Sequence, residues 1–273
     1  MLEQKDALVT AYPQFSGKTV FVAGGTSGIN LEIARSFAHH GACVAVASRD
    51  PARVEAATAE LRAISPAAIG LPCDVRDYGA VAEVLAKVRE RLGEIDIAIS
   101  GAAGNFVVPA GKMSSNAFRT VVDIDLIGTF NVYRAAFEHL RRPGASLIAI
   151  SAPQGSRAYA GQAHVCAAKA GINMLTKCLA LEWGPHGIRV NAISPGPVEG
   201  TEGMARLAPT GELEKRLTSA IPLRRFGQAK EIAEAVLFLA GPGAQFVTGA
   251  VLDCDGGFSA GGGAAFSASS MEH

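Results

Sequence analysis

The sequence is short of cysteine and of charge. Its five cysteines are an odd number, scattered along the chain without a CxxC pair, so we expect reduced thiols rather than a disulfide framework. Charged residues make up only 18%, and the 25 basic residues equal the 25 acidic ones, which leaves a formal net charge of zero. Without a basic excess, the chain carries no electrostatic footprint for nucleic acid.

Long apolar runs are also lacking, so no segment is predicted to cross a membrane. The first fifteen residues contain acids and no apolar centre, which does not match a signal peptide. Neither the cysteines nor the six histidines form a metal-ligand cluster. These absences predict a cytoplasmic protein without a metal or a membrane partner.

Apolar residues are plentiful, at 49%, and their pattern alternates short β-branched runs with longer Ala-rich segments. We expect strands at 19–24, 43–48, 68–73, 95–100, 145–150, 189–193 and 250–253, and helices at 28–40, 51–64, 78–92, 115–140, 161–183 and 229–240. The strands are nearly continuous apolar runs, which is typical of a parallel sheet covered on both faces. The fold class is therefore α/β: a single-domain Rossmann fold with a doubly wound, mostly parallel seven-stranded sheet.

Two segments depart from this alternation. Residues 196–227 form a long insertion rich in Gly, Pro, Arg and Glu, and we expect them to act as a lid. Residues 259–273 are rich in Gly, Ala and Ser and are expected to be a flexible tail. No linker divides the rest, so residues 1–258 are predicted to be one domain for dinucleotide binding and catalysis.

A glycine-rich turn follows the first expected strand. Its residues Gly24, Thr26, Ser27, Gly28 and Ile29 lead directly into the first helix. Glycines at this point let the backbone approach a pyrophosphate, and the helix N-terminus supplies positive potential. The turn therefore predicts a dinucleotide cofactor.

The end of the second strand favours NADP(H) over NAD(H). An NAD-preferring site has a carboxylate here for the ribose 2′-hydroxyl, but this chain has Ser48 followed by Arg49, which can pair with a 2′-phosphate. Asp50 could neutralise Arg49, so NAD(H) is not excluded.

Further motifs follow in a fixed order: DV at 74–75, SGAAG at 100–104, RVN at 189–191, PG at 195–196 and DGG at 255–257. Together with the glycine turn they resemble the short-chain dehydrogenase/reductase family. The resemblance implies a cofactor site that also includes Asp74, Val75, Gly101, Ala102, Lys169, Pro195, Gly196 and Val198.

The chain departs from that family at its catalytic positions. The lysine of the YxxxK pair is present as Lys169, but the tyrosine position is Val165. Ala152 stands at the serine position and Asp125 at the asparagine position, while Asn30 replaces the third glycine of the TGxxxGxG pattern. We expect Asn30 to keep the first helix from packing quite as closely there.

These departures resemble one branch of the family. The segments GAAGNF at 101–106, DIDLIGTFN at 123–131, AKAG at 168–171 and PGPVEGTEG at 195–203 are similar to 2,4-dienoyl-CoA reductases, especially the peroxisomal type, which also lacks the tyrosine. The resemblance implies an acyl-CoA substrate and a homotetramer formed through helices 115–140 and 161–183. The C-terminal SMEH is not a peroxisomal SKL-type signal, which keeps the cytoplasmic prediction.

The chemistry of a conjugated thioester explains how a phenol can be dispensable. Reducing a ketone needs an acid aimed at oxygen, whereas reducing a dienoyl thioester places the final proton on a carbon. What remains necessary is positive potential, donors for the thioester oxygen and a proton source. We expect Lys169, Asp125 and Asp255, with a bound water, to form the proton-delivery system.

Substrate contacts are predicted around the same site. Asn105 and Phe106 follow the fourth strand and should line the pocket near the thioester, with Tyr159 on another wall. In the lid, Arg206 is a candidate for the coenzyme A phosphates, as are Lys215, Arg216, Arg224 and Arg225.

Three other interpretations remain open. The chain could be an ordinary reductase of a 3-oxoacyl or ketone substrate that uses Ser151 or Tyr159 in an unusual arrangement. It could be a catalytically inactive nucleotide-binding protein, which Asn30 and Ala152 would favour. It could also reduce a different conjugated substrate, such as an unsaturated cyclic acid.

Overall fold

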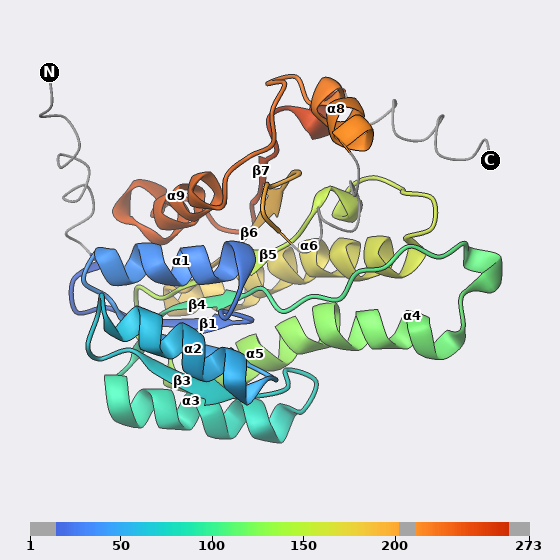
Figure 1. Ribbon diagram of the computed structural model, residues 1–273. Helices are drawn as coiled ribbons and strands as arrows, with labels where there is room; N and C mark the ends of the chain where they lie inside the picture. The colour runs from blue at the N-terminus through green and yellow to red at the C-terminus, as the bar shows by residue number, and fades with distance from the viewer. Residues whose placement is uncertain (1–14, 202–210, 262–273) are drawn as a thin grey trace, which may run out of the picture.

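A seven-stranded sheet forms the centre of the computed structural model, which describes residues 15–201 and 211–261 (Figure 1). The strands are β1 (Thr19–Ala23), β2 (Cys43–Ser48), β3 (Ile69–Pro72), β4 (Ile95–Ser100), β5 (Ser146–Ile150), β6 (Arg189–Pro195) and β7 (Val251–Cys254). Their order is β3-β2-β1-β4-β5-β6-β7, and every neighbouring pair is parallel. The predicted seven-stranded sheet is confirmed.

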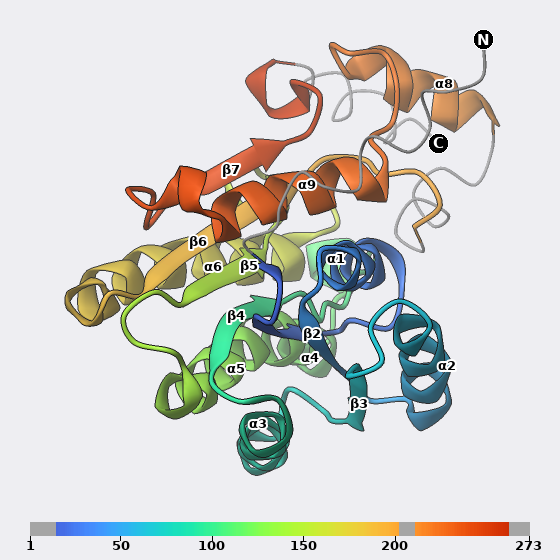
Figure 2. The ribbon, with the colours of Figure 1, turned by 90° about the vertical axis from the view of Figure 1, so that its left-hand side faces the viewer.

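Helices cover both faces of the sheet (Figure 2). One face carries α1 (Gly28–His39), α2 (Pro51–Arg62) and α9 (Ala229–Ala240), and the other carries α3 (Tyr78–Leu92), α5 (Gly128–Ala136) and α6 (Ala163–Trp183). Each face has its own apolar core, with Phe37 and Val236 on the first and Val84, Val132 and Ile172 on the second. The strands are apolar on both sides because both sides are buried, and β1 is buried at all five positions.

The strand order creates a crevice between β1 and β4. The chain leaves β1 toward β2 on one side, and β4 pairs with β1 on the other, so the connections diverge at this point. Ligands of open α/β sheets bind in such a crevice, outside the carboxyl ends of the strands. Gly24 and Gly101, which follow β1 and β4, therefore face the same opening.

The predicted helix over 115–140 is wrong in one respect. The structure has α4 (Ser115–Val122), then a π-helical turn, η3 (Asp123–Ile127), and only then α5. The apolar periodicity continues through the π-turn, which is why the sequence pattern did not reveal it. Such single turns occur often at functional sites.

The insertion contains an element that was not expected. Helix α8 (Gly211–Ala220) forms part of the 196–227 segment and buries Leu217. The expected tail from residue 259 begins inside a short 3-10 turn, Phe258–Ala260, and residues 262–273 lie outside the described part. Within the described ranges, no helix is long and apolar enough to cross a membrane.

Candidate active site

A pocket of about 610 Å³ opens at the carboxyl end of the sheet. It is lined from α1, from the segments that follow β4, β5 and β6, from α6 and from the lid. The structure brings ten of the predicted site residues into its wall: Gly28, Ile29, Gly101, Asn105, Asp125, Tyr159, Lys169, Pro195, Gly196 and Val198.

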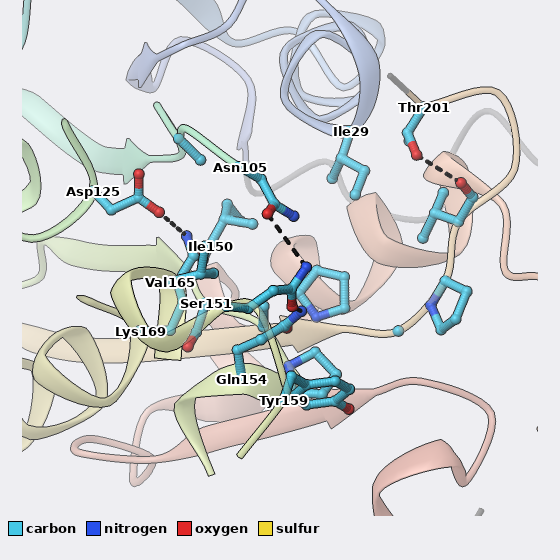
Figure 3. Close-up of a pocket in the computed structure, with 18 of the residues that line it drawn as sticks. Ile29, Asn105, Asp125, Ile150, Ser151, Gln154, Tyr159, Val165, Lys169 and Thr201 are labelled. Atoms are coloured by element: carbon cyan, nitrogen blue, oxygen red, sulfur yellow. Dashed lines mark hydrogen bonds and ion pairs between the residues drawn. The ribbon is translucent and has the colours of Figure 1, made fainter. Parts of the chain in front are cut away.

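Lys169 and Asp125 form a buried ion pair in this wall (Figure 3). The Lys169 ammonium lies 3.1 Å from Asp125 Oδ2 and donates a hydrogen bond of 3.0 Å to the carbonyl of Ile150, the last residue of β5. Asp125 is fully buried, and its Oδ1 accepts a 2.8 Å bond from the N–H of Gly104. Each charge is thus balanced by the other and by the backbone, which a buried pair requires.

The π-turn η3 carries Asp125. The N–H of Gly128 reaches back to the carbonyl of Asp123, and the hydroxyl of Thr129 donates a 2.6 Å bond to the carbonyl of Asp125. The side-chain hydroxyl therefore satisfies a carbonyl in the irregular turn, and the carboxylate remains directed toward α6.

Apolar side chains occupy the positions where a carbonyl reductase has its acid groups. Val165, one turn before Lys169, is 2% exposed and packs with Val121 and Ala168. Ser151 lines the pocket, but its hydroxyl donates a 2.6 Å bond to Asn173 Oδ1. These contacts disfavour Ser151 as the acid of an ordinary reductase.

Tyr159 is also poorly suited to act as the acid of an ordinary reductase. Burial raises the pKa of its hydroxyl above the ordinary value, which makes it a weaker acid. It lines the pocket from the segment between β5 and α6, in agreement with its predicted place in the substrate wall.

The glycine turn makes a cradle at the start of α1. Gly24 has a φ of +76°, and a Cβ there would lie 2.8 Å from the backbone nitrogen of Ala102. Gly28 has a φ of +54° and has open space where a Cβ would be. Ser27, the N-cap of α1, makes no side-chain capping bond, and the first turn holds no acid. The turn from Gly24 through Thr26 to Gly28 thus leaves the N-terminus of α1 available to an anion.

Arg49 lies exposed just after β2, as a 2′-phosphate ligand would. The carboxylate of Asp50 is instead directed to the start of α2, where it accepts the N–H groups of Ala52 and Arg53. Asp74 forms hydrogen bonds with Arg76, which lower the pKa of its carboxyl group, and the charge of Arg49 adds to this.

Val75 and Asn30 hold this end of the site together by packing. A Cβ on Gly128 would lie 2.6 Å from Val75 Cγ2, so α5 approaches Val75 closely. Asn30 Nδ2 donates a 2.8 Å bond to the carbonyl of Gly101, and a Cβ on Gly101 would lie 2.2 Å from Asn30 Oδ1. The expected loss of close packing at Asn30 is therefore offset by a bond from α1 to the end of β4.

Comparison with known proteins agrees with this geometry. The model of a family described as enoyl-(acyl carrier protein) reductase matches residues 23–259. A crystal structure of a short chain dehydrogenase from Bacillus anthracis superimposes with a TM-score of 0.81 at 34% identity, covering 89% of this chain and 97% of that one. The chain belongs to the short-chain dehydrogenase/reductase family.

Among short-chain dehydrogenases/reductases, similar sequences include the peroxisomal 2,4-dienoyl-CoA reductase [(3E)-enoyl-CoA-producing] of Pongo abelii. It is 46% identical over 88% of this chain and 83% of its own length. An actinorhodin polyketide ketoreductase, crystallised with NADPH, superimposes with a TM-score of 0.82 at 31% identity, covering 90% of this chain and 98% of that one.

Two of the predicted catalytic and substrate residues, Asp255 and Phe106, do not line the pocket of this short-chain dehydrogenase/reductase. Asp255 lines a neighbouring hollow, where its Oδ1 accepts the N–H of Gly257 at 2.9 Å and its Oδ2 the N–H of Ser259 at 2.6 Å. Phe106 stacks instead on His164, with ring centroids 4.2 Å apart. Arg206 lies outside the described residues.

The sequence analysis missed a row of amides on the pocket wall. Gln154 Nε2 donates to Gln162 Oε1 at 2.8 Å, and Gln162 Nε2 donates to Asn105 Oδ1 at 3.4 Å. Gln162 is only 3% exposed. A polar residue at the start of an otherwise apolar helix was the signal that could have found it.

Proposed function

We propose that this protein is an NADPH-dependent reductase of conjugated unsaturated acyl-CoA thioesters, similar in activity to a 2,4-dienoyl-CoA reductase. The observation that carries the proposal is the buried Lys169–Asp125 pair beside Val165. This pocket has a cation and a carboxylate, and an apolar side chain where a ketone-reducing enzyme of the family has its phenol. The named activity of the Pongo abelii relative supports the same choice.

The cofactor site fits a nicotinamide dinucleotide. The cradle at Gly24 and Gly28 leaves room for a pyrophosphate against the N-terminus of α1. Pro195, the last residue of β6, and Gly196 and Val198 after it line the pocket, where we place the nicotinamide. The NADPH named with the actinorhodin ketoreductase supports the assignment. When bound, NADPH supplies the hydride, which adds to the far end of the diene.

Negative charge then spreads along the substrate to the thioester oxygen. The Lys169 ammonium supplies positive potential near this charge in a site of low dielectric, where its effect is large. Asn105, held by the buried Gln162, lies in the same wall and is proposed to contact the thioester.

The reaction ends with a proton on the carbon alpha to the thioester. Addition of hydride at the far end and of a proton at this carbon leaves a 3-enoyl product, which agrees with the (3E)-enoyl-CoA in the relative's name. We assign the delivery of this proton to the Lys169–Asp125 pair and a water bound beside it. The part in proton delivery that the sequence predicted for Asp255 has less support, because both of its carboxylate oxygens already accept backbone N–H groups.

The acyl chain is proposed to lie under the lid, against Leu217 and Phe258. Of the lid cations suggested for coenzyme A, Arg225 pairs with Glu231 and Arg224 donates to the carbonyl of Ser219. Arg216 on α8 lies 3.9 Å from Glu212, so Lys215 on the same helix is the better candidate. The proposed contact of Arg206 with the coenzyme A phosphates rests on the sequence alone, because Arg206 lies outside the described residues.

We also propose that the chain forms a homotetramer through the helices on one face. Ile127, Phe130, Met174 and Leu181 project from η3, α5 and α6 with exposures of 42 to 81%. Exposed apolar groups that gather on neighbouring helices are typical of subunit contacts. Light scattering on the purified protein tests this assembly. The cytoplasmic location stays a prediction, since the Pongo abelii relative is named as peroxisomal.

The decisive experiment compares substrates. NADPH oxidation is followed with a 2,4-dienoyl-CoA and, in parallel, with a 3-ketoacyl-CoA of the same chain length. We expect turnover of the dienoyl thioester and at least a hundredfold lower kcat/KM for the ketone, about 2.7 kcal/mol in barrier. Faster reduction of the ketone would support the ordinary reductase. NADPH binding without turnover of either would support the inactive nucleotide-binding protein.

The preference for NADPH is tested at Arg49. In R49A, KM for NADPH should rise about fivefold to tenfold, because an exposed cation near a phosphate contributes about 1 kcal/mol. KM for NADH should change little, since NADH has no 2′-phosphate. Arg53 on the exposed surface of α2 provides the matched control, R53A. Equal effects on both cofactors would exclude a contact with the 2′-phosphate.

A further inference from the structure

His164 is a buried titratable group that the proposed reaction does not yet use. It lies in the first turn of α6 and is 0% exposed. Neither ring nitrogen has a hydrogen-bond partner among residues 15–201 and 211–261. The imidazole is therefore a fully buried polar group to which the described residues give no hydrogen bond.

An imidazole cannot remain in this state without cost. In its neutral form one nitrogen donates and the other accepts, and each group left unpaired in the interior loses the hydrogen bond that water gives it in the unfolded chain. Buried polar groups without a protein partner are usually satisfied by internal water, which makes two to four bonds. Water beside His164 would supply the bonds that the ring nitrogens lack.

The same short segment covers His164 and Asp125. The N–H of Gly104 binds Asp125 Oδ1, and two residues later the ring of Phe106 stacks on His164 at 4.2 Å with the planes inclined by 44°. Phe106 is itself 37% exposed, so this stack lies close to solvent. One loop therefore touches both the buried carboxylate and the imidazole, and its Phe106 ring reaches solvent.

Charge connects the two groups as well. Burial lowers the pKa of His164, and the negative charge of Asp125, on η3, opposes that effect. The covering segment 104–106 adds no charged residue, and the α4 side chain nearest in the packing cluster, Val121, is apolar. Lys169, five residues along α6, is held by Asp125.

We propose that His164 and the water beside it return protons from solvent to Asp125 after each turnover. The proposal rests on the proposed function, in which every reduction consumes one proton in the buried pocket. Lys169 and Asp125 are only 6% and 0% exposed, so they need a path to solvent that stays available while substrate fills the pocket.

The transfer balances within the relay. A solvent hydronium ion gives a proton to one ring nitrogen, forming an N–H bond. The N–H bond at the other nitrogen breaks, and its proton passes through water to the group at Asp125 that protonated the substrate. The imidazole ends neutral in its other tautomer, no electrons are transferred, and exchange of the ring protons with water restores the starting tautomer.

The first test needs no substrate. The histidine ring resonances of the ¹⁵N-labelled full-length protein are titrated in the wild type and in D125N. Because the Asp125 charge stabilises imidazolium, the pKa of His164 should fall in D125N. His186, in the 3-10 turn that follows α6, supplies the control resonance. An unchanged His164 titration would overturn the proposal even if the enzyme reduces dienoyl-CoA.

The second test measures proton delivery during turnover. In H164A, kcat should fall about tenfold to a hundredfold, and the kinetic isotope effect in D₂O should rise as proton transfer becomes limiting. Added imidazole should restore much of the rate. H186A is the matched control, because His186 also contacts a phenylalanine ring, that of Phe137, and should retain activity and isotope effect.

The outcomes separate this proposal from the proposed function. If wild-type protein does not reduce dienoyl-CoA, the function fails and the relay fails with it. If wild type is active and H164A keeps its kcat and D₂O effect, changing only KM, His164 is a pocket support and the relay is wrong. If H164A does not fold, H164N serves instead, and it should show the same slow, isotope-sensitive step without imidazole rescue.

Discussion

The carboxylates of Asp125 and Asp255 are held in two different ways. Asp125 is buried at an irregular helical turn, with one oxygen on the Lys169 ammonium and the other on a single N–H. Asp255 follows β7 and uses both oxygens to fix the turn that leads to Phe258. A cation as partner keeps a charge in the pocket for chemistry, whereas two backbone partners use a charge to shape a loop. The comparison predicts different consequences when each side is altered.

The largest effect is expected on the Asp125 side, from K169A. Removing the ammonium takes away the positive potential and leaves Asp125 buried without its partner. We expect kcat with dienoyl-CoA to fall by more than a thousandfold, or about 4 kcal/mol, and the thermal midpoint to drop. K177A, at an exposed position on the same helix, is the matched control. Turnover within about tenfold of wild type would show that Lys169 is not required.

D125N should be nearly as severe in activity but milder in folding. The amide oxygen can still accept the N–H of Gly104, while the negative charge beside Lys169 is lost. We expect kcat to fall by about a hundredfold to a thousandfold, with the far-ultraviolet circular dichroism spectrum unchanged. Normal turnover by D125N would show that the Asp125 carboxylate is not needed for the reaction.

D255N should reduce the stability of the fold more than the activity. The amide can accept only one of the two N–H groups, so the turn at Gly257 and Ser259 loses about 1 kcal/mol of stability. We expect kcat to stay within tenfold of wild type while the urea midpoint falls. A folded D255N protein as inactive as D125N would instead support the proton-delivery role that the sequence suggested for Asp255.

The smallest effect is expected from Glu231, which lines the same hollow as Asp255. Its bonds to Arg225 and to the N–H of Gln228 lower its pKa from 4.5 to about 2. The unfolded chain therefore binds this proton more readily, and the stabilisation is present above about pH 4.5 and is lost as pH falls toward 2. Because both side chains are half exposed, E231Q should cost less than about 1 kcal/mol at pH 7.

This prediction is checked by urea unfolding of wild type and E231Q at several pH values. The difference between them should shrink as the pH falls, and kcat should be unchanged at pH 7. A large loss of kcat would place the Arg225–Glu231 pair in the reaction rather than in the support of the lid.

The sheet, its covering helices and the cofactor cradle could be predicted from the sequence because each depends on local pattern. β1 reads as a continuous apolar run, and the glycines at 24 and 28 are required where φ is positive. The approach of Lys169 to Asp125 was predictable from family positions, but its distance and its bond to Ile150 were not.

The remaining features could not be predicted from the local sequence pattern. The π-turn at Asp123–Ile127 does not interrupt the apolar pattern, so periodicity could not reveal it. The capping of the turn by Asp255 involves residues only two and four positions away, yet the same residue type before Gly-Gly was compatible with either role. The stack of Phe106 on His164 joins a loop to a helix that lies 58 positions later, which no local signal encodes.

The contact between Asn30 and Gly101 limits how this chain can have diverged from its relatives. A Cβ on Gly101 would lie 2.2 Å from Asn30 Oδ1, so a side chain at residue 101 would displace the Asn30 amide from the carbonyl that it binds. A lineage that gains a side chain at residue 101 should therefore also change residue 30, and the two sites should covary.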